Sequence, residues 1–436
     1  MNQNVVDIKY DIKGKECEFI DRLARLDVNL DRSTPEVDFD SDIFDELFVK
    51  MGDNLNSLYL KNKYLYYFAE GAIGYLEALY SMREYIEKQT KYEINNVYSL
   101  IKEYIIKHGL NKNINFISLG CGNGTKDLEI FKESKKKKEE VFLKKYVPID
   151  ISPYLLQLAI QRFYKESPST QVTAINSDFL IFDEALIKSI PNDENTRIFT
   201  LLGSTLGNYK EKELLGRISS IMQPNDLLVI GVELFQDKED LKKQFVKYSS
   251  TGNYLFLMQP FKLIPKYRGY LDYPNKYFKM DDGNFLHRPE ICEVKDALSL
   301  TPTLVIPGRG PIYMAWTTKY NYLGLKNDFF RKDNLADIFL ELCEIEATKL
   351  ELNYGVYLLK RNQFDIDILK QNLLTNLNSK KNSLIAKNEK NKLEKIVDLV
   401  TACTINSSIL SCYELFQKYR TINDKVEDGI LKIFEV

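Results

Sequence analysis

The chain has 436 residues, of which 44% are hydrophobic and 28% are charged, a mixture typical of globular proteins with a sizeable core. Its 60 Lys and Arg nearly balance its 62 Asp and Glu, so the net charge of −2 argues against nucleic acid or an anionic membrane as a partner. With two His and six dispersed Cys, none in a CxxC pair, we expect neither a metal site nor a disulfide framework.

The N-terminal sequence is polar and lacks the apolar stretch of a signal peptide. No uninterrupted apolar run approaches the roughly 18 residues of a membrane span. Dispersed cysteines suit a reducing compartment, so we expect a cytoplasmic protein.

Residues 1–90 are predicted to form the N-terminal, helical part of a substrate domain. The first sixty residues are acidic and irregular, with helical patterning around residues 41–60. Residues 63–108 are also predicted to be helical, because apolar side chains recur there at spacings of three and four.

Residues 91–236 are predicted to form the first part of an α/β domain. From about Asn115 onward, short β-rich runs such as residues 114–120 and 145–151 alternate with helical stretches such as residues 152–166. Strands that alternate with helices of roughly 10–15 residues imply βαβ units and a parallel sheet with helices on both faces.

The alternation ends near residue 237. Residues 237–315 are rich in Tyr, Pro and Gly and are predicted to form an inserted substrate or lid subdomain. Residues 316–361, with a helix expected around residues 334–342 and then two strands, are predicted to return to the sheet. Residues 362–436 are predicted to be a helical C-terminal extension.

The glycines Gly120, Gly122 and Gly124 follow the first β-rich run and precede a helix directly. Glycines at such a place allow a tight turn and a close approach of the backbone to a ligand, and the helix N-terminus presents free N–H groups. We interpret the segment as a cofactor-binding loop, although dehydrogenases and plain turns share this spacing.

Carboxylates stand at the ends of the next two strands. Asp150 ends the second strand, where an acidic residue hydrogen-bonds ribose hydroxyls in nucleoside-binding α/β folds. Asp178 and Phe179 end the third, where a carboxylate can bind the adenine amine and an aromatic ring can flank the base. Each residue alone has an alternative as a turn or helix cap. Their order at consecutive strand ends predicts a nucleoside site at the carboxyl edge of the sheet.

The predicted ligand is S-adenosylmethionine rather than NAD. Thr125 and Lys126 follow the glycines in place of the third, helix-packing glycine of the dinucleotide fingerprint. The Asp-Phe pair and the late strand pair also resemble the seven-strand methyltransferases. The predicted fold class is therefore α/β, a Rossmann-like seven-strand class I methyltransferase sheet with a second, smaller substrate-covering domain and a helical C-terminal extension.

The sequence LLGSTLGNY, residues 201–209, is very similar to a motif of the histidine-specific N-methyltransferase family that begins ergothioneine synthesis. The segments GNGTK, YVPIDISP, SDF and GVELFQDKEDL also resemble that family, in the same order. The similarity spans roughly residues 64–361, and the remaining residues at both ends lie outside it.

This resemblance implies the residues that bind the cofactor. Gly120 and Lys126 would contact its methionine end, Asp150 its ribose, and Asp178 with Phe179 its adenine. Tyr66, in KYLYYFAEG, matches a tyrosine near the cofactor in the family, although the Asp that follows there is Tyr67 here.

The resemblance also implies the residues that bind the substrate. Gly203 and Asn208 match the family's contacts to the α-amino and carboxylate groups of an amino acid, and Tyr248 lies one residue away from a tyrosine that touches the same groups. An amide such as Asn208 can orient both groups without holding a charge, whereas its structural alternative is support of the turn after Gly207.

In the family, a Glu and a Ser bind the imidazole side chain of histidine, and this chain has different residues at both positions. Ala315 stands at the Glu position and Thr317 at the Ser position, and the family's EYYPTRAE segment is altered, keeping Tyr85. An unpaired polar substrate group costs roughly 1–3 kcal/mol, so histidine is expected to be a poor substrate. Trp316, the single Trp, is a core residue or lines a reshaped pocket.

We predict an S-adenosylmethionine-dependent N-methyltransferase of a small amine or amino-acid-like substrate, with Asn208 and Tyr248 as catalytic residues. The sulfonium methyl is already activated, so the enzyme contributes alignment and amine deprotonation. Three alternatives stay open: a protein or peptide methyltransferase, a non-catalytic adenosylmethionine-binding protein, and a nucleotide-dependent oxidoreductase.

Overall fold

In the computed structural model, every strand predicted for the α/β part of the chain is present. The described residues are 6–11, 16–21, 47–51, 57–67, 69–136, 141–178, 180, 184–248, 251–260, 278–279, 285–288, 292, 294, 297–305, 311–314, 317–322, 325, 340–349 and 352–361. The predicted C-terminal extension, residues 362–436, lies outside them.

Five parallel strands form the centre of a large sheet, in the order β7-β6-β5-β8-β9. Their bounds are Asn113–Leu119 for β5, Phe142–Asp150 for β6, Gln171–Asn176 for β7, Thr196–Leu201 for β8 and Leu227–Phe235 for β9. Every residue of β8 and β9 is buried, as expected for parallel strands covered on both faces.

Two later strands complete the sheet on the far side of β9. β17 (Tyr354–Arg361) pairs antiparallel with β9, and β16 (Leu340–Lys349) pairs antiparallel with β17. The resulting order, β7-β6-β5-β8-β9-β17-β16, has one reversed strand and confirms the predicted seven-strand class I sheet. The helix expected around residues 334–342 is wrong at its end, because residues 340–342 belong to β16; the rest of it is not described.

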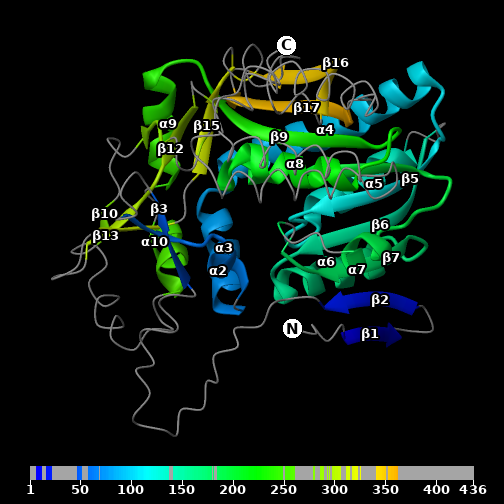
Figure 1. Cartoon of the computed structure of the whole chain (residues 1–436), viewed down its shortest axis with the longest axis horizontal. Helices are drawn as coiled ribbons and strands as arrows, with labels where there is room; N and C mark the ends of the chain where they lie inside the picture. The colour runs from blue at the N-terminus through cyan, green and yellow to red at the C-terminus, as the bar shows by residue number, and fades with distance from the viewer. Residues whose placement is uncertain are drawn as a thin grey trace, which may run out of the picture.

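Helices cover both faces of this sheet (Figure 1). Phe116 of β5 belongs to the core under one set of helices, while its neighbour Ile117 belongs to the core on the opposite face. The helices of the first set are α4 (Arg83–His108), α5 (Thr125–Lys136) and α6 (Pro153–Glu166), and those of the second are α7 (Glu184–Ser189) and α8 (Glu211–Ile221). Successive side chains of a strand point to opposite faces, so each strand joins the two cores.

The N-terminal ninety residues are less helical than predicted. β1 (Val6–Asp11) and β2 (Glu16–Asp21) form a hairpin whose second strand extends the main sheet beside β7 (Figure 1). The stretch predicted as helical around residues 41–60 contains β3 (Phe48–Met51) and β4 (Ser57–Leu60). β2 pairs with β7, and β4 pairs with residues 312 and 313, so partners distant in sequence complete their hydrogen bonds, which a local spacing pattern does not reveal.

The helices predicted within residues 63–108 are present. They are α2 (Lys63–Tyr67), α3 (Ala69–Ser81) and α4. The helix α4 runs without interruption through residues 90 and 91, where we placed a domain boundary, so the boundary falls inside one helix. It ends at Gly109, whose φ of 64° gives the left-handed C-cap that favours glycine.

Residues from the N-terminal part and from the insertion build a second, smaller sheet. Its order is β10-β13-β14-β4-β3, with β14 parallel to β4. The new strands are β10 (Phe278–Lys279), β13 (Thr303–Val305) and β14 (Pro311–Tyr313). Leu60, Leu65, Phe256 and Leu304 share the core beneath it, so both segments fold as one unit.

The remaining insertion elements lie against the end of β9. The strand β15 (Thr317–Asn321) runs parallel to its last residues and pairs with β12 (Ala297–Leu300), which pairs with β11 (Phe285–Leu286). The helices α9 (Lys238–Tyr248) and α10 (Thr251–Met258) follow β9, and α10 packs against α3. Among the described helices, none combines the length and apolar character that a membrane crossing requires.

Candidate active site

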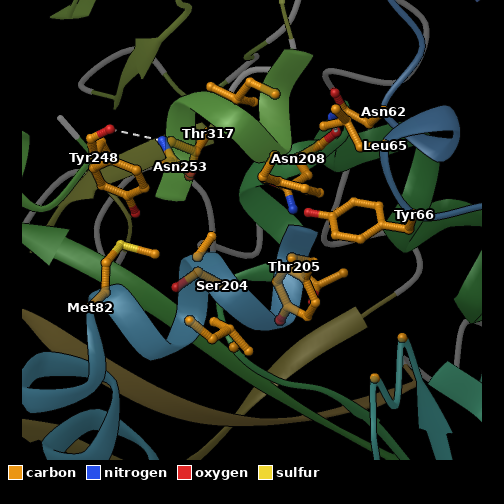
Figure 2. A pocket seen from close by; sticks show the side chains of 18 of the residues that line it. Asn62, Leu65, Tyr66, Met82, Ser204, Thr205, Asn208, Tyr248, Asn253 and Thr317 are labelled. Carbon is orange, nitrogen blue, oxygen red and sulfur yellow. Dashed lines mark hydrogen bonds between the residues drawn. The ribbon is translucent and has the colours of Figure 1, made fainter. Parts of the chain in front are cut away.

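A cavity opens where the carboxyl ends of the central strands meet α2, α3, α4 and α10. It holds about 1270 Å³ of empty space, part of it open to solvent. Eight of the residues singled out from the sequence line it: Tyr66, Gly120, Gly122, Asp150, Gly203, Asn208, Tyr248 and Thr317. Figure 2 shows Tyr66, Asn208, Tyr248 and Thr317 around this space, with the side chains of Asn208 and Tyr66 pointing toward each other in that view.

Asp150, Gly120 and Gly122, which are predicted to bind the cofactor, line the cavity together. The two carboxylate oxygens of Asp150 accept backbone N–H groups, one from Gly122 at 2.8 Å and one from Ser152 at 2.9 Å. Gly120 and Gly122 have φ values of 69° and 55°, which favour glycine. A Cβ at Gly122 would meet nothing within 4 Å, so the turn presents open backbone to a ligand.

The buried position of Asp150 changes its acidity. Burial raises the pKa of this carboxyl group from its ordinary 3.8 to about 6, although the N–H groups of Ser152 and Gly122 oppose the shift. Each oxygen keeps a further lone pair for a hydroxyl donor. The carboxylate therefore fits a ribose diol, as predicted from its place at the end of β6.

We expect cofactor affinity to depend on pH through Asp150. The charged carboxylate is the stronger acceptor, so ribose binding displaces its proton. Kd should be constant above pH 7 and should rise by up to about tenfold per unit as the pH falls below about 6. The stability of the unliganded protein changes with pH in the opposite direction. Because the pKa of Asp150 is higher in the folded than in the unfolded chain, this group stabilises the fold fully below pH 3.8, and the contribution is lost as the pH rises through about 6. Calorimetric titrations with the cofactor between pH 5 and 8 measure the pH dependence of Kd. Asp150→Asn should abolish this dependence, and a flat wild-type profile would contradict the prediction.

Gly124 does not line the cavity. Its φ is 71°, and a Cβ there would lie 2.7 Å from the Cβ of Ala159 on α6. The glycine predicted to contact the cofactor instead lets the start of α5 pack against α6. Its spacing in the sequence does not distinguish these two roles.

We expect Gly124→Ala to destabilise the fold by roughly 1–3 kcal/mol, because it combines a left-handed backbone with a steric overlap. The melting temperature measures this effect. The double variant Gly124→Ala with Ala159→Gly removes the overlap with the Ala159 Cβ but leaves the Cα of residue 159 at 2.9 Å, so it should recover only part of the loss. Equal stability of the wild type and Gly124→Ala would show that the close packing is not required.

The predicted adenine site is described in part. Asp178 is half-buried, and its Oδ1 accepts the N–H of Leu180 at 2.9 Å. Burial raises the pKa of Tyr209, a residue that lines the cavity, and the nearby charge of Asp178 adds to the shift. Asp178 thus lies beside the cavity, while Phe179 falls outside the described residues. Both assignments stay predictions.

Lys126 lies next to Gly203, which lines the cavity. Its Nζ lies 2.8 Å from Oε2 of Glu93, and a Cβ at Gly203 would approach that Nζ to 2.6 Å. Glu93 was not found from the sequence.

Tyr66 lines the cavity, and burial raises the pKa of its hydroxyl, with further contributions from Tyr75 and Asp150. The Tyr66 hydroxyl is therefore a hydrogen-bond donor at neutral pH.

Asn208 ends a short 3-10 helix, η1 (Thr205–Asn208), that follows β8. Its backbone carbonyl accepts a hydrogen bond from Nδ2 of Asn62, a residue missed by the sequence reasoning. A Cβ at Gly207 would lie 2.6 Å from the carbonyl oxygen of Thr318, so η1 packs directly on β15. The backbone of this loop is held on two sides, which leaves the Asn208 side chain available to a ligand.

Tyr248 belongs to a buried polar cluster at the other end of the cavity. Its hydroxyl donates to Oε2 of Glu233 at 2.8 Å and accepts from Nζ of Lys319 at 2.5 Å. Lys319 also forms an ion pair with Glu233 and donates to Oγ1 of Thr317 at 3.2 Å. Burial lowers the pKa of Lys319, whereas the adjacent carboxylate favours its charged form.

This cluster restricts the chemistry of Tyr248. Burial raises the pKa of its hydroxyl, so it does not act as a general base at neutral pH. A protonated Tyr248 can still orient a substrate. Glu233 and Lys319 were not singled out from the sequence, although a Glu inside the apolar run of β9 is an unusual feature.

Ala315, which stands at the family's Glu position, and Trp316 lie outside the described residues. Thr317 lines the cavity, and the backbone of Tyr85 lies in α4. No cluster of potential metal ligands occurs in the part of the chain that the structure describes.

Solved structures with a similar arrangement include an S-adenosylmethionine-dependent methyltransferase from Clostridium acetobutylicum. It is 11% identical, with coverage of 60% of this chain and 89% of that one and a TM-score of 0.32. The CcbJ methyltransferase from Streptomyces caelestis is 12% identical, with coverage of 62% and 95% and a TM-score of 0.34.

The strand order, the glycine turn and the carboxylate at the end of β6 define the class, a Rossmann-like α/β domain of the methyltransferase type. Residues 49–250 match the family model of histidine-specific, SAM-dependent methyltransferases. The family's cofactor is S-adenosylmethionine, whose ribose the paired acceptors of Asp150 fit.

Curated relatives are histidine N-alpha-methyltransferases. The one from Mycobacterium tuberculosis is 27% identical over 106 residues, which are 24% of this chain and 32% of the relative. The one from Mycolicibacterium smegmatis is 26% identical over 132 residues, 30% of this chain and 39% of the relative. The matched part of the chain thus spans 32% and 39% of the lengths of these relatives.

Proposed function

We propose that this protein is an N-methyltransferase that transfers the methyl group of S-adenosylmethionine to a small amine or amino-acid-like substrate. The observation that carries the proposal is that Asp150 and Asn208 line one cavity. One residue is suited to the cofactor's ribose and the other to an amino-acid head group, so the two ligands would meet within the same space.

When bound, S-adenosylmethionine supplies an activated methyl carbon, to which an amine nitrogen bonds as the C–S bond breaks and sulfur keeps the electron pair. The protein's part is alignment. Asp150 and the glycine turn hold the nucleoside, and Asn208 orients the amine from a loop fixed by Asn62. Such positioning accounts for a large share of the rate of two-reactant chemistry. The amine reacts in its neutral form, and its displaced proton passes to solvent.

The substrate is proposed to differ from histidine. Ala315 offers no partner for an imidazole N–H, and the polar groups of Tyr248, Glu233 and Thr317 already bond to one another or to Lys319. Asn62 lines the cavity, and its Oδ1 has no hydrogen-bond partner among the described residues. This oxygen is therefore available as an acceptor for a substrate. A substrate N–H donor would suit this oxygen.

A screen with methyl-labelled cofactor tests the proposal. The full chain is incubated with free amino acids including histidine, with small amines and with short peptides, and labelled products are identified by mass. We expect label in a free amine or amino acid, with kcat/KM for histidine at least tenfold below that of the best substrate. Comparable values would refute the exclusion of histidine, labelled peptides would support a peptide methyltransferase, and cofactor binding without transfer would mean a non-catalytic protein.

A further inference from the structure

Glu93 lies on α4 and is fully buried, yet it carries an ionisable carboxyl group. Three donors from three different elements surround this group. The ammonium of Lys126 on α5 lies 2.8 Å from Oε2, the backbone N–H of Gly203 donates to Oε1 at 2.8 Å, and the hydroxyl of Tyr354 on β17 donates to the same oxygen. A buried carboxylate is costly unless it is paired, and this one is fully supplied with donors.

The neighbouring backbone is shaped to admit this carboxylate. Gly231 on β9 lies against it, and any side chain at that position would overlap both Oε1 of Glu93 and the hydroxyl of Tyr354. Burial raises the pKa of Tyr354, and the charge of Glu93 adds to the shift, so its hydroxyl is protonated and donates. The peptide N–H of Ser204 donates to the carbonyl of Gly231 at 3.1 Å, which ties the same loop to β9.

The two groups that Glu93 holds belong to different parts of the site. Lys126 follows the glycine turn on α5, whereas Gly203 begins the loop that leads to Asn208. The carboxylate therefore spans the cofactor end and the substrate end of the cavity. The side chain of Lys126 is 28% exposed, so without an anchor its ammonium would move through many rotamers.

We propose that Glu93 is a positioning residue that sets the Lys126 ammonium for the amino-acid end of the cofactor and fixes the Gly203 peptide at the start of the loop that leads to Asn208. The ligand group it prepares for is an α-carboxylate, which a fixed ammonium binds by charge and hydrogen bonding. The inference rests on the proposed function, because it requires an amino-acid-bearing nucleoside in this cavity. Glu93 itself makes no contact with the ligand.

Binding of two different nucleosides distinguishes a positioning role of Glu93 from a general contribution to stability. S-adenosylhomocysteine carries the amino-acid end, and 5′-methylthioadenosine has the same nucleoside without it. For Glu93→Gln we expect calorimetry to show an affinity for S-adenosylhomocysteine at least tenfold lower, with the affinity for 5′-methylthioadenosine unchanged within twofold. Glu103→Gln, an exposed Glu on the same helix, is the matched control and should alter neither.

Lys126→Met provides a second variant should Glu93→Gln fold poorly, because it leaves the buried carboxylate with two donors. It should show the same selective loss, and combining both substitutions should add less than the sum of their separate effects. Equal losses for both nucleosides in either variant would overturn the inference and leave the proposed function standing. A wild-type protein that binds neither nucleoside would overturn both.

Discussion

Replacing Asp150 with Ala is expected to weaken binding of S-adenosylmethionine or its demethylated product at least tenfold, about 1.4 kcal/mol. The structure gives two reasons for a large effect. The variant loses the acceptors for the ribose hydroxyls, and it also releases the N–H groups of Gly122 and Ser152 that the carboxylate holds at 2.8 and 2.9 Å. The glycine turn would then lose its fixed geometry.

Calorimetry of the wild type and Asp150→Ala measures this effect, with the melting temperature as a check on folding. Asp237→Asn is a suitable control, since the Oδ1 of Asp237 also accepts two backbone N–H groups, those of Glu239 and Asp240, on the exposed start of α9. It should change stability slightly and affinity not at all. A folded Asp150→Ala with wild-type Kd would remove Asp150 from the cofactor site.

The sequence predicted the α/β sheet because its signals are local. Runs such as residues 196–201 and 227–235 are continuously apolar, and buried parallel strands require that pattern. Asp150 and Asn208 could be predicted to lie close together for a related reason, since residues at the carboxyl ends of parallel strands meet at one edge of the sheet. Both line the same cavity.

The N-terminal strands show where this reasoning fails. β2 is paired with β7, about 150 residues further along the chain, and β4 with β14, about 250 residues further. Such partners are chosen by tertiary packing, and a helical spacing near residues 41–60 carries no information about them. The close packing of Gly124 was not predicted for the same reason, because its neighbour Ala159 belongs to another helix.

The buried charges were missed because charged residues normally lie at the surface. Glu93 nevertheless carries a signal, since Val97 and Ile101 follow it at spacings of four and all three are fully buried on one face of α4. A carboxylate that continues an apolar stripe is a recognisable feature. Lys319 has no equivalent signal, because its neighbours Thr318 and Tyr320 are buried as well and the alternation of a strand is absent.

Replacing Asn208 with Ala should separate substrate binding from cofactor binding. The backbone of η1 keeps its hydrogen bond from Asn62 and its packing of Gly207 on Thr318, so the melting temperature and the cofactor Kd should be nearly unchanged. The loss of one orienting contact and the resulting misalignment of the amine should lower kcat/KM by ~10²-fold, roughly 2–3 kcal/mol in the transition state.

The comparison requires the melting temperature, the cofactor Kd and kcat/KM for the best amine from the labelled-cofactor screen, all on one variant. Asn192→Ala, in an exposed turn where its Oδ1 accepts from Gln223 at 2.7 Å, is the control and should match the wild type in all three. Asn62→Ala should behave differently from Asn208→Ala, because it frees the loop backbone and so lowers stability together with turnover. If Asn208→Ala folds, binds cofactor and turns over at the wild-type rate, the substrate's head group lies elsewhere and the amino-acid-like part of the proposed function fails.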